Sequence, residues 1–402
     1  MESAELKLNK RIYSIDLLRG IIMVIMALDH TRDFIHYDAF LHDPLDIETT
    51  SLALYFTRWI THFCAPIFIF LSGVSIYLQS FRKSKIDLSK FLFKRGLWLI
   101  FVEFIIMGFL WSFNFQFPMF FLQVIWAIGI SMVFMSVLIH LPYILILITG
   151  SLIVCLHNVL DGINSTHQGF FWDVLHNGHF AAHAINQDHT LLIVYPFLPW
   201  LGVMMLGYCL GKLYEQTISV DFRRNFLLIK GIGLILFFIL LRWTNYYGDP
   251  IPWSAQNDFL HTLLSFFNIN KYPPSLLFLC ITLGPALIVL SLTDSINASI
   301  ASSNKLVKIF NIYGSVPFFY YILHFYLIHL IAGVLYFTRG HAWSEPDIIP
   351  NGPPFAFMVS GEGYSLGIVY LVWILVVISL YPLCKWFSEY RKRNSYWWLG
   401  YV

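Results

Sequence analysis

The chain has 402 residues, of which 58% are hydrophobic and only 12% are charged. An ordinary water-soluble domain has about 25% charged residues, so this composition excludes a soluble globular protein. The net charge of +2 at pH 7 indicates no particular partner. Five cysteines lie scattered, mostly within apolar stretches, and their spacing matches neither a zinc site nor a disulfide framework.

Ten apolar segments follow one another along the chain, most of them long enough to cross a hydrocarbon core of about 30 Å as a helix. In chain order they are residues 13–34, 56–79, 91–113, 117–139, 142–159, 190–213, 225–243, 273–293, 313–337 and 363–386. Helix is the expected conformation, because lipid offers no hydrogen-bond partners for an open strand. We therefore predict an all-α polytopic integral membrane protein with about ten transmembrane helices, forming a single domain over residues 1–402.

Lysine and arginine concentrate in alternate connections between these segments. The basic connections contain Lys7, Lys10, Arg11, Arg82, Lys83, Lys85, Lys90, Lys94, Arg95, Lys212, Arg223, Arg224, Lys230, Lys305, Lys308, Lys385, Arg391, Lys392 and Arg393. The intervening connections are poor in lysine and arginine, and they are residues 35–55, 160–189, 244–272 and 338–362. The positive-inside rule therefore predicts that both termini are cytoplasmic.

The first apolar segment contains ionisable residues that a plain membrane anchor does not need. Arg19 lies near its cytoplasmic end and His30 near its outer end, eleven positions later. Eleven residues make almost three helical turns, so both side chains share one helix face, about 16 Å apart along the axis. Ionisable groups inside a membrane normally face a protein interior or a wet cavity. The pair predicts a passage between the two sides of the membrane; the alternative is that Arg19 is interfacial and His30 caps a helix end.

Carboxylates flank both of these residues. Asp16 precedes Arg19 by three positions, which is close enough for an ion pair on a helix. Asp33 follows His30 by three positions and Asp29 is adjacent to it, so either carboxylate could hold the imidazole in one tautomer.

Two further residues lie near the middle of apolar segments. Glu103 is a buried carboxylate that needs a partner or a proton, and we expect Arg19 to be that partner. For His324 the favoured interpretation is a core histidine whose hydrogen bonds are satisfied.

Several stretches resemble a known family of membrane enzymes. They are Ser14–Gly20, Phe56–Ser75, Tyr195–Gly202, Lys271–Leu276 and Gly314–His324. Arg19, ten intervening residues and His30 match the first-helix signature of the acyltransferase family 3 membrane proteins. The ordered set is more similar to the catalytic domain of the heparan-α-glucosaminide N-acetyltransferase family and its bacterial relatives, and the similarity extends over nearly the whole chain.

The resemblance implies transfer of an acyl group, typically acetyl, from cytoplasmic coenzyme A to an amine or hydroxyl of a sugar on the outer side. His30 would be the general base or a transient acyl carrier, oriented by Asp29 or Asp33. His36 is the second candidate for this role and His42 the third. The expected location is a bacterial inner membrane. The alternative function is a polytopic transporter that moves a polar solute or a proton along the same buried charges.

Two groups of side chains are expected to bind the substrates. Four cations would bind the phosphates of acetyl-CoA, and they are Arg11, Arg19, Lys94 and Arg95. Guanidinium groups bind phosphate bidentately, although the positive-inside rule also accounts for Lys94 and Arg95. On the outer side a polar vestibule for the acceptor would contain Arg32, Arg58 and His62. The alternative for Arg58 and His62 is an interfacial belt of salt bridges.

The loop after the fifth segment is rich in histidine, with His167, His176, His179, His183 and His189. His176, His179 and His183 could share one helical face, but no cysteine or paired carboxylate completes a metal site. We therefore expect no metal. The expected partners are a coenzyme A thioester, an extracytoplasmic sugar or glycan and the lipid bilayer, with no nucleic acid. A homodimer stays open as an oligomeric state.

Overall fold

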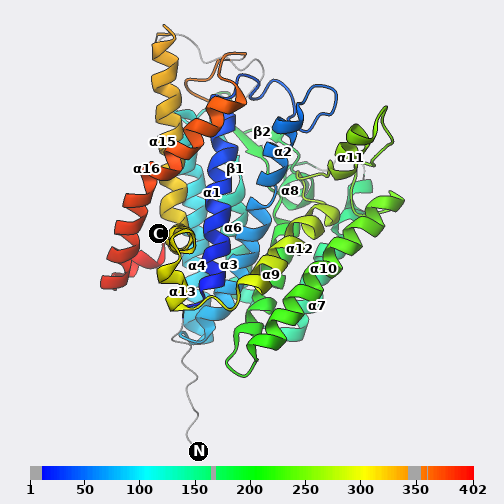
Figure 1. Cartoon of the computed structure of the whole chain (residues 1–402), viewed down its shortest axis with the longest axis vertical. Coiled ribbons are helices and arrows are strands. Elements are labelled where there is room, and N and C mark those ends of the chain that lie inside the picture. The colour runs from blue at the N-terminus through cyan, green and yellow to red at the C-terminus, as the bar shows by residue number, and fades with distance from the viewer. Residues whose placement is uncertain (1–10, 164–168, 343–354, 360) are drawn as a thin grey trace, which may run out of the picture.

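The computed structural model is mostly helical and describes residues 11–163, 169–342, 355–359 and 361–402. Lys7, Lys10 and His167 of the sequence-based predictions lie outside these residues. Helix α1, Tyr13–Ile35, runs through the middle of a helical bundle (Figure 1). It packs against α14 (Lys305–Ser315), α15 (Pro317–Thr338), α16 (Leu366–Arg393) and α3 (Cys64–Ser80). The first predicted segment is therefore the central helix of the fold.

The remaining elements complete the fold. Those before residue 170 are α2 (Leu52–Thr61), α4 (Lys85–Phe101), the π-helical turn Val102–Met107, α5 (Gly108–Ser112), β1 (Met119–Leu122), α6 (Val124–Leu138), α7 (Tyr143–Leu156) and a 3-10 turn (His157–Gly162). Those that follow are α8 (Gly169–Trp172), a π-helical turn (Asp173–Asn177), β2 (Ala181–Ala184), β3 (Thr190–Ile193), α9 (Phe197–Gly211), a 3-10 turn (Lys212–Tyr214), α10 (Val220–Thr244), α11 (Phe259–Phe267), α12 (Leu276–Thr293), α13 (Ala298–Ser303) and a 3-10 turn (Trp397–Gly400).

Seven helical stretches within the described residues are long and apolar enough to cross a membrane. They are Leu52–Ser80, Tyr143–Gly162, Phe197–Tyr214, Val220–Thr244, Leu276–Thr293, Pro317–Thr338 and Leu366–Arg393. The other three predicted segments also form helices, but α1 and α4 carry several charged residues and α6 has only 15 residues. The total of ten spans and the cytoplasmic position of both termini stay predictions.

A small sheet interrupts the helical fold, which the all-α prediction did not include. Its strand order is β1-β3-β2, with β1 parallel and β2 antiparallel to β3. Strands β1 and β3 occupy the first residues of the predicted segments 117–139 and 190–213, so the prediction of helix was wrong there. Short apolar runs do not distinguish a buried strand from a helix, and these two strands satisfy each other's backbone groups.

Serine side chains fix the start of several helices. The hydroxyl oxygens of Ser51, Ser84, Ser219 and Ser275 each accept a hydrogen bond from a backbone N–H in the first turn of α2, α4, α10 and α12. A cap of this kind satisfies one of the amides that a helix N-terminus leaves without an intrahelical partner. The sequence thus sets where these helices begin.

Two glycines allow α1 and α14 to cross at backbone contact. A Cβ atom on Gly20 would overlap the carbonyl oxygen of Phe310, and one on Gly314 would overlap the carbonyl oxygen of Asp16. Only a residue without a side chain permits this approach. The crossing brings Arg19 to α14, where its Nη1 donates to the carbonyl oxygen of Gly314 at 3.2 Å.

Candidate active site

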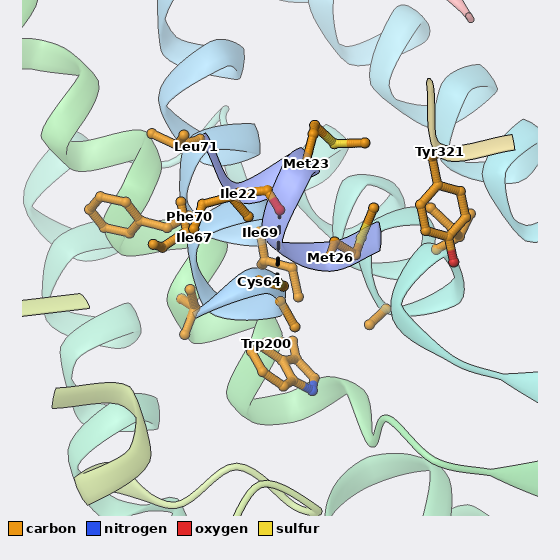
Figure 2. Packing of buried hydrophobic residues seen from close by; sticks show 14 of the residues in the cluster. Ile22, Met23, Met26, Cys64, Ile67, Ile69, Phe70, Leu71, Trp200 and Tyr321 are labelled. Carbon is orange, nitrogen blue, oxygen red and sulfur yellow. Dashed lines mark hydrogen bonds between the residues drawn. The ribbon is translucent and has the colours of Figure 1, made fainter. Parts of the chain in front are cut away.

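One face of α1 carries the residues of the site in register. Arg19, Met23, Met26 and His30 are spaced by four, three and four positions, so they form a single stripe along the helix. The first three line a cavity of about 230 Å³, whose wall also includes Tyr321 of α15. Figure 2 shows Met23 and Met26 on the side of α1 that faces Tyr321. His30 follows one helical turn after Met26.

Three arginines from three helices line this cavity: Arg19 of α1, Arg95 of α4 and Arg391 of α16. Arg19 donates to Ser75 Oγ at 3.0 Å and to Asp16 Oδ1 at 3.3 Å. Arg95 donates to the carbonyl oxygen of Gly400. Arg391 is exposed and donates to the carbonyl oxygen of Ser315 at 2.9 Å. Serine and glutamine side chains complete a polar wall with a positive charge, and they are Ser72, Ser75, Gln79 and Ser315.

The predicted coenzyme A ligands divide into two pairs. Arg19 and Arg95 line the cavity, whereas Arg11 and Lys94 do not. Arg11 donates to Asp16 Oδ2 at 2.5 Å and to a backbone carbonyl of α14 at 3.1 Å. Lys94 is exposed on α4. Sequence reasoning missed Arg391, because the positive-inside rule already accounted for it.

His30 hydrogen-bonds to His324 of α15, with 2.8 Å between His30 Nδ1 and His324 Nε2. His324 Nδ1 lies 2.9 Å from the carbonyl oxygen of Tyr320, which can only accept. His324 Nδ1 therefore carries a hydrogen, and in the neutral ring Nε2 is the acceptor. It follows that His30 Nδ1 is the donor and that the lone pair of His30 lies on Nε2. A neutral His30 in this tautomer is a base.

Aromatic rings surround His30. The ring centroids of Phe325, Tyr321 and Trp111 lie 4.7, 6.1 and 6.2 Å from the His30 centroid, all in edge-to-face arrangements. Tyr321 also lines the cavity. The end of the cavity that is remote from the arginines therefore adjoins His30.

The expectation that Asp29 or Asp33 orients His30 was wrong. Arg58 Nη1 lies 2.9 Å from both carboxylate oxygens of Asp29, and Arg32 Nη2 lies 2.9 Å from Asp29 and 2.5 Å from Asp33. Two guanidinium groups compete for these carboxylates, and ionised pairs form stronger hydrogen bonds than a neutral imidazole. The imidazole is oriented by His324 instead.

The expected pair of Glu103 and Arg19 was also wrong. Glu103 lies in the π-helical turn Val102–Met107, and its Oε2 accepts from the backbone N–H of Trp126 at 2.8 Å. It therefore caps the N-terminus of α6, where a carboxylate satisfies free amides. Arg19 already has Asp16, Ser75 and a backbone carbonyl as partners.

A second polar cluster lies beyond His30, around the pair of Asp29 and Arg58. Lys271 is buried, with 7% of its surface exposed, and its ammonium group lies 5.1 Å from the ring centroid of Tyr272. The Tyr272 ring is edge-to-face with that of Tyr195, with 5.5 Å between the centroids. Burial alone would raise the pKa of the Tyr272 hydroxyl, but Lys271 and Arg58 lower it below its ordinary value. The cluster is cationic and hydroxyl-rich.

A family model described as "Heparan-alpha-glucosaminide N-acetyltransferase, catalytic" matches residues 11–241, more than half of the chain. The chain belongs to this family. The match confirms the resemblance drawn from the sequence, and it identifies the protein as a member of a family of membrane acetyltransferases. No curated protein matches the chain.

In this heparan-α-glucosaminide N-acetyltransferase family member, the matched range does not contain the whole site. His30, Arg19 and Arg95 lie within residues 11–241, whereas His324 and Arg391 lie beyond them. The fold brings both sets together around α1. The sequence signal that could have identified His324 and Lys271 was their position in two of the stretches that carry the family resemblance.

The other predicted histidines of the family member lie apart from His30. His36 follows the end of α1, where its Nδ1 accepts from the backbone N–H of Asp38 at 3.2 Å, and burial lowers its pKa. His42 is exposed and hydrogen-bonds to the carboxylate of Asp38 at 2.7 Å. His62 is buried at the end of α2, edge-to-face with Phe278 at 5.3 Å.

His176, His179 and His183 do not share one helical face, so the arrangement that their spacing allowed does not occur in the structure. His176 pairs with Asp161 and His183 with Asp173, each at 2.8 Å, and His183 lies on strand β2 rather than on a helix. Within the part of the chain that the structure describes, no group of three or more His, Cys, Asp or Glu side chains could hold a metal ion.

Proposed function

We propose that the protein transfers an acetyl group from acetyl-CoA to an amine or hydroxyl of a sugar, with His30 as the general base. The observation that carries the proposal is the bond between His30 and His324, which leaves the lone pair of His30 on Nε2. His30 lies one helical turn beyond Met26 of the arginine-lined cavity. Family membership supports the acetyl transfer.

The cavity has the chemistry expected for the donor substrate. Coenzyme A carries phosphates at one end and its thioester at the other, so a suitable site needs cations at one end and a reactive group at the other. Arg19, Arg95 and Arg391 supply the cations, and arginine binds phosphate bidentately. The positive-inside rule predicts that these residues lie on the cytoplasmic side. The wall then becomes apolar toward Met26 and Tyr321, which suits a pantetheine chain.

The proposed transfer balances without a further reactant. His30 Nε2 removes the proton from the acceptor N–H or O–H as the acceptor attacks the thioester carbonyl carbon. The carbon–sulfur bond breaks, and the imidazolium of His30 returns the proton to the thiolate of coenzyme A. His324 Nε2 accepts from His30 Nδ1 throughout, so it stabilises the imidazolium while the proton resides there.

The test is an assay in proteoliposomes with acetyl-CoA labelled in the acetyl group and glucosamine as the acceptor. We expect labelled product from the wild-type protein and at least a hundredfold less from His30→Ala, because general-base catalysis contributes about 10² to 10⁴ in rate. The matched control is His261→Ala, which removes an exposed histidine of α11. Equal loss of activity in both variants would contradict the assignment.

Two other outcomes would support a different role for His30 or a different function for the protein. Label on His30 in the absence of an acceptor would identify His30 as an acyl carrier rather than a general base. Movement of a polar solute into liposomes without coenzyme A, combined with no acetyl transfer, would favour the transporter that the sequence left open.

A further inference from the structure

Attack on a thioester turns its carbonyl oxygen into an oxyanion, so the proposed transfer needs a hydrogen-bond donor at that oxygen. The two histidines of the site do not supply it. The one hydrogen of each neutral ring is already donated, from His30 Nδ1 to His324 and from His324 Nδ1 to the carbonyl oxygen of Tyr320. The donor must therefore come from another side chain.

The wall of the cavity contains one side-chain donor that the protein itself does not use. Its three arginines donate to oxygens of the protein, as do Ser72, Ser75, Gln79 and Ser315. Tyr321 differs from them, because its hydroxyl makes no hydrogen bond within the described part of the chain. Only 5% of Tyr321 is exposed, and buried polar groups normally have a partner. Its hydroxyl is therefore free to bind a ligand in the cavity.

Tyr321 also lies where the thioester is expected. It precedes His324 by three positions on α15, so the two side chains share one helix face. The Tyr321 ring centroid lies 5.6 Å from that of His324 and 6.1 Å from that of His30. Figure 2 shows Tyr321 on the side of α1 that Met26 faces, one helical turn before His30. Tyr321 therefore borders both the cavity and the pair of imidazoles.

Trp111 is another unused donor near His30, because its buried Nε1 has no hydrogen-bond partner among the described residues. Its ring centroid lies 6.2 Å from that of His30, but Trp111 does not line the cavity. It stacks on Phe34, which follows His30 by one turn of α1, and on Phe355. Trp111 thus extends beyond His30 and away from the cavity, so it is the weaker candidate.

We propose that Tyr321 is a further catalytic residue, whose hydroxyl donates a hydrogen bond to the carbonyl oxygen of the thioester. The inference rests on the proposed function, because it supplies the oxyanion donor for the same reaction. As the acceptor bonds to the carbonyl carbon, the electron pair of the carbon–oxygen double bond moves to the oxygen, where Tyr321 stabilises it and keeps its own proton. The double bond then re-forms, the carbon–sulfur bond breaks, and the thiolate takes the proton from His30.

The first test compares Tyr321→Phe with the wild type in the assay with labelled acetyl-CoA. We expect kcat to fall about 10²- to 10³-fold, the loss that follows removal of one oxyanion donor. KM for acetyl-CoA should stay unchanged, because the bond strengthens only as the oxygen becomes negative. The unfolding temperature should also stay unchanged, because the missing hydroxyl has no partner in the described part of the chain.

The matched control is Tyr326→Phe, which removes a hydroxyl from the same helix at a position that is 42% exposed and does not line the cavity. It should keep the activity of the wild type. A rise in KM with unchanged kcat in Tyr321→Phe would make Tyr321 a binding residue and overturn the proposal. So would full activity of Tyr321→Phe combined with a low kcat of Trp111→Phe.

The second test measures binding to the purified protein in detergent and needs no acceptor. The probe is an acetyl-CoA analogue in which a trifluoromethyl ketone replaces the thioester, because such a ketone adds water or a nucleophile and then resembles the tetrahedral oxyanion. Tyr321→Phe should bind this ketone about ten- to a hundredfold more weakly than the wild type, the loss expected for one hydrogen bond to a charged group. Both proteins should bind coenzyme A equally.

Equal affinity of the two proteins for the ketone would overturn the assignment of Tyr321. Acetyl transfer by the wild type and its loss in His30→Ala would still support the proposed function in that case, so the two failures are distinguishable. A wild type that transfers no acetyl group would overturn the proposed function, and this inference with it.

Discussion

The imidazole rings of His30 and His324 lie in hydrogen-bond contact at 2.8 Å, although 294 positions separate the two residues in the chain. The rings are also stacked, with centroids 5.0 Å apart and planes inclined by 13°. His324 is in turn fixed by the carbonyl oxygen of Tyr320. The hydrogen on His30 Nδ1 is therefore determined by a residue of α15, a neighbouring helix that is distant only in the sequence.

Replacing His324 should lower kcat without weakening the binding of the donor substrate. In His324→Leu the imidazole of His30 loses its acceptor, and we expect kcat to fall about a hundredfold, within the range that general-base catalysis contributes. KM for acetyl-CoA should change little, because His324 does not line the cavity. Steady-state kinetics with labelled acetyl-CoA measure both constants.

His324→Gln provides the control for a merely structural role. Its amide oxygen can still accept from His30 Nδ1, so it should recover part of the activity that His324→Leu loses. The pH profile of kcat should also shift between the two variants. Identical kinetics and identical pH profiles would mean that His324 only fills space.

Arg391 should contribute to the affinity for acetyl-CoA. Arg391→Gln removes one cation of the cavity, and the loss of a charge-assisted hydrogen bond to phosphate should raise KM about ten- to a hundredfold. Lys392→Gln changes the same charge at the next position, which does not line the cavity, and should behave like the wild type. A similar KM in both variants would exclude Arg391 as a ligand.

The crossing of α1 and α14 should not tolerate a side chain at Gly20. In Gly20→Ala the added methyl group overlaps the carbonyl oxygen of Phe310, and overpacking of this kind costs about 1 to 3 kcal/mol. Gly233→Ala on α10 is the control, because nothing lies within 4 Å of its added Cβ and alanine favours a helix over glycine. Thermal unfolding in detergent should show a loss of stability for Gly20→Ala only.

Acidification should lower the stability that His36 contributes at the end of α1. Burial lowers the pKa of His36 below its ordinary value of about 6.5, so the unfolded chain binds a proton at a higher pH than the folded one. The stability that depends on neutral His36 is therefore complete above that ordinary pKa and is lost as the pH falls through the folded value. Protonation also removes the Nδ1 acceptor for the N–H of Asp38.

The measurement is the unfolding temperature of the wild type and His36→Asn between neutral pH and pH 5. The wild type should lose more stability over this window than His36→Asn, because asparagine at position 36 does not titrate. Parallel curves for the two proteins would contradict the assignment of this pH dependence to His36.

Much of the fold follows from local patterns in the sequence. Long apolar stretches predicted the helices, and the spacing of Arg19 and His30 predicted that both lie on one face of α1. The cavity is lined by Arg19, Met23 and Met26 of that stripe and ends one turn before His30, so the passage between the two sides of the membrane stays a prediction. Strands β1 and β3 were missed, because four apolar residues carry no period that separates strand from helix.

The partners of the site residues could not be predicted in the same way. His324 and Lys271 reach the site only through tertiary packing, so spacing along the chain carries no information about their contacts. The expected partners Asp29 and Asp33 were close to His30 in sequence, but Arg58 and Arg32 bind them more strongly. Local proximity predicted ion pairs within a helix and failed for hydrogen bonds between helices.

Helix α1 opens the described fold, while His324 and Arg391 belong to its last two long helices, α15 and α16. During synthesis α1 is therefore inserted long before its partners leave the ribosome. A nascent chain has neither the fixed tautomer of His30 nor the full set of arginines until α16 is in place. Under the proposed function, partly translated copies should therefore show no acetyl transfer, and the same holds for copies that lose the final helices by early termination.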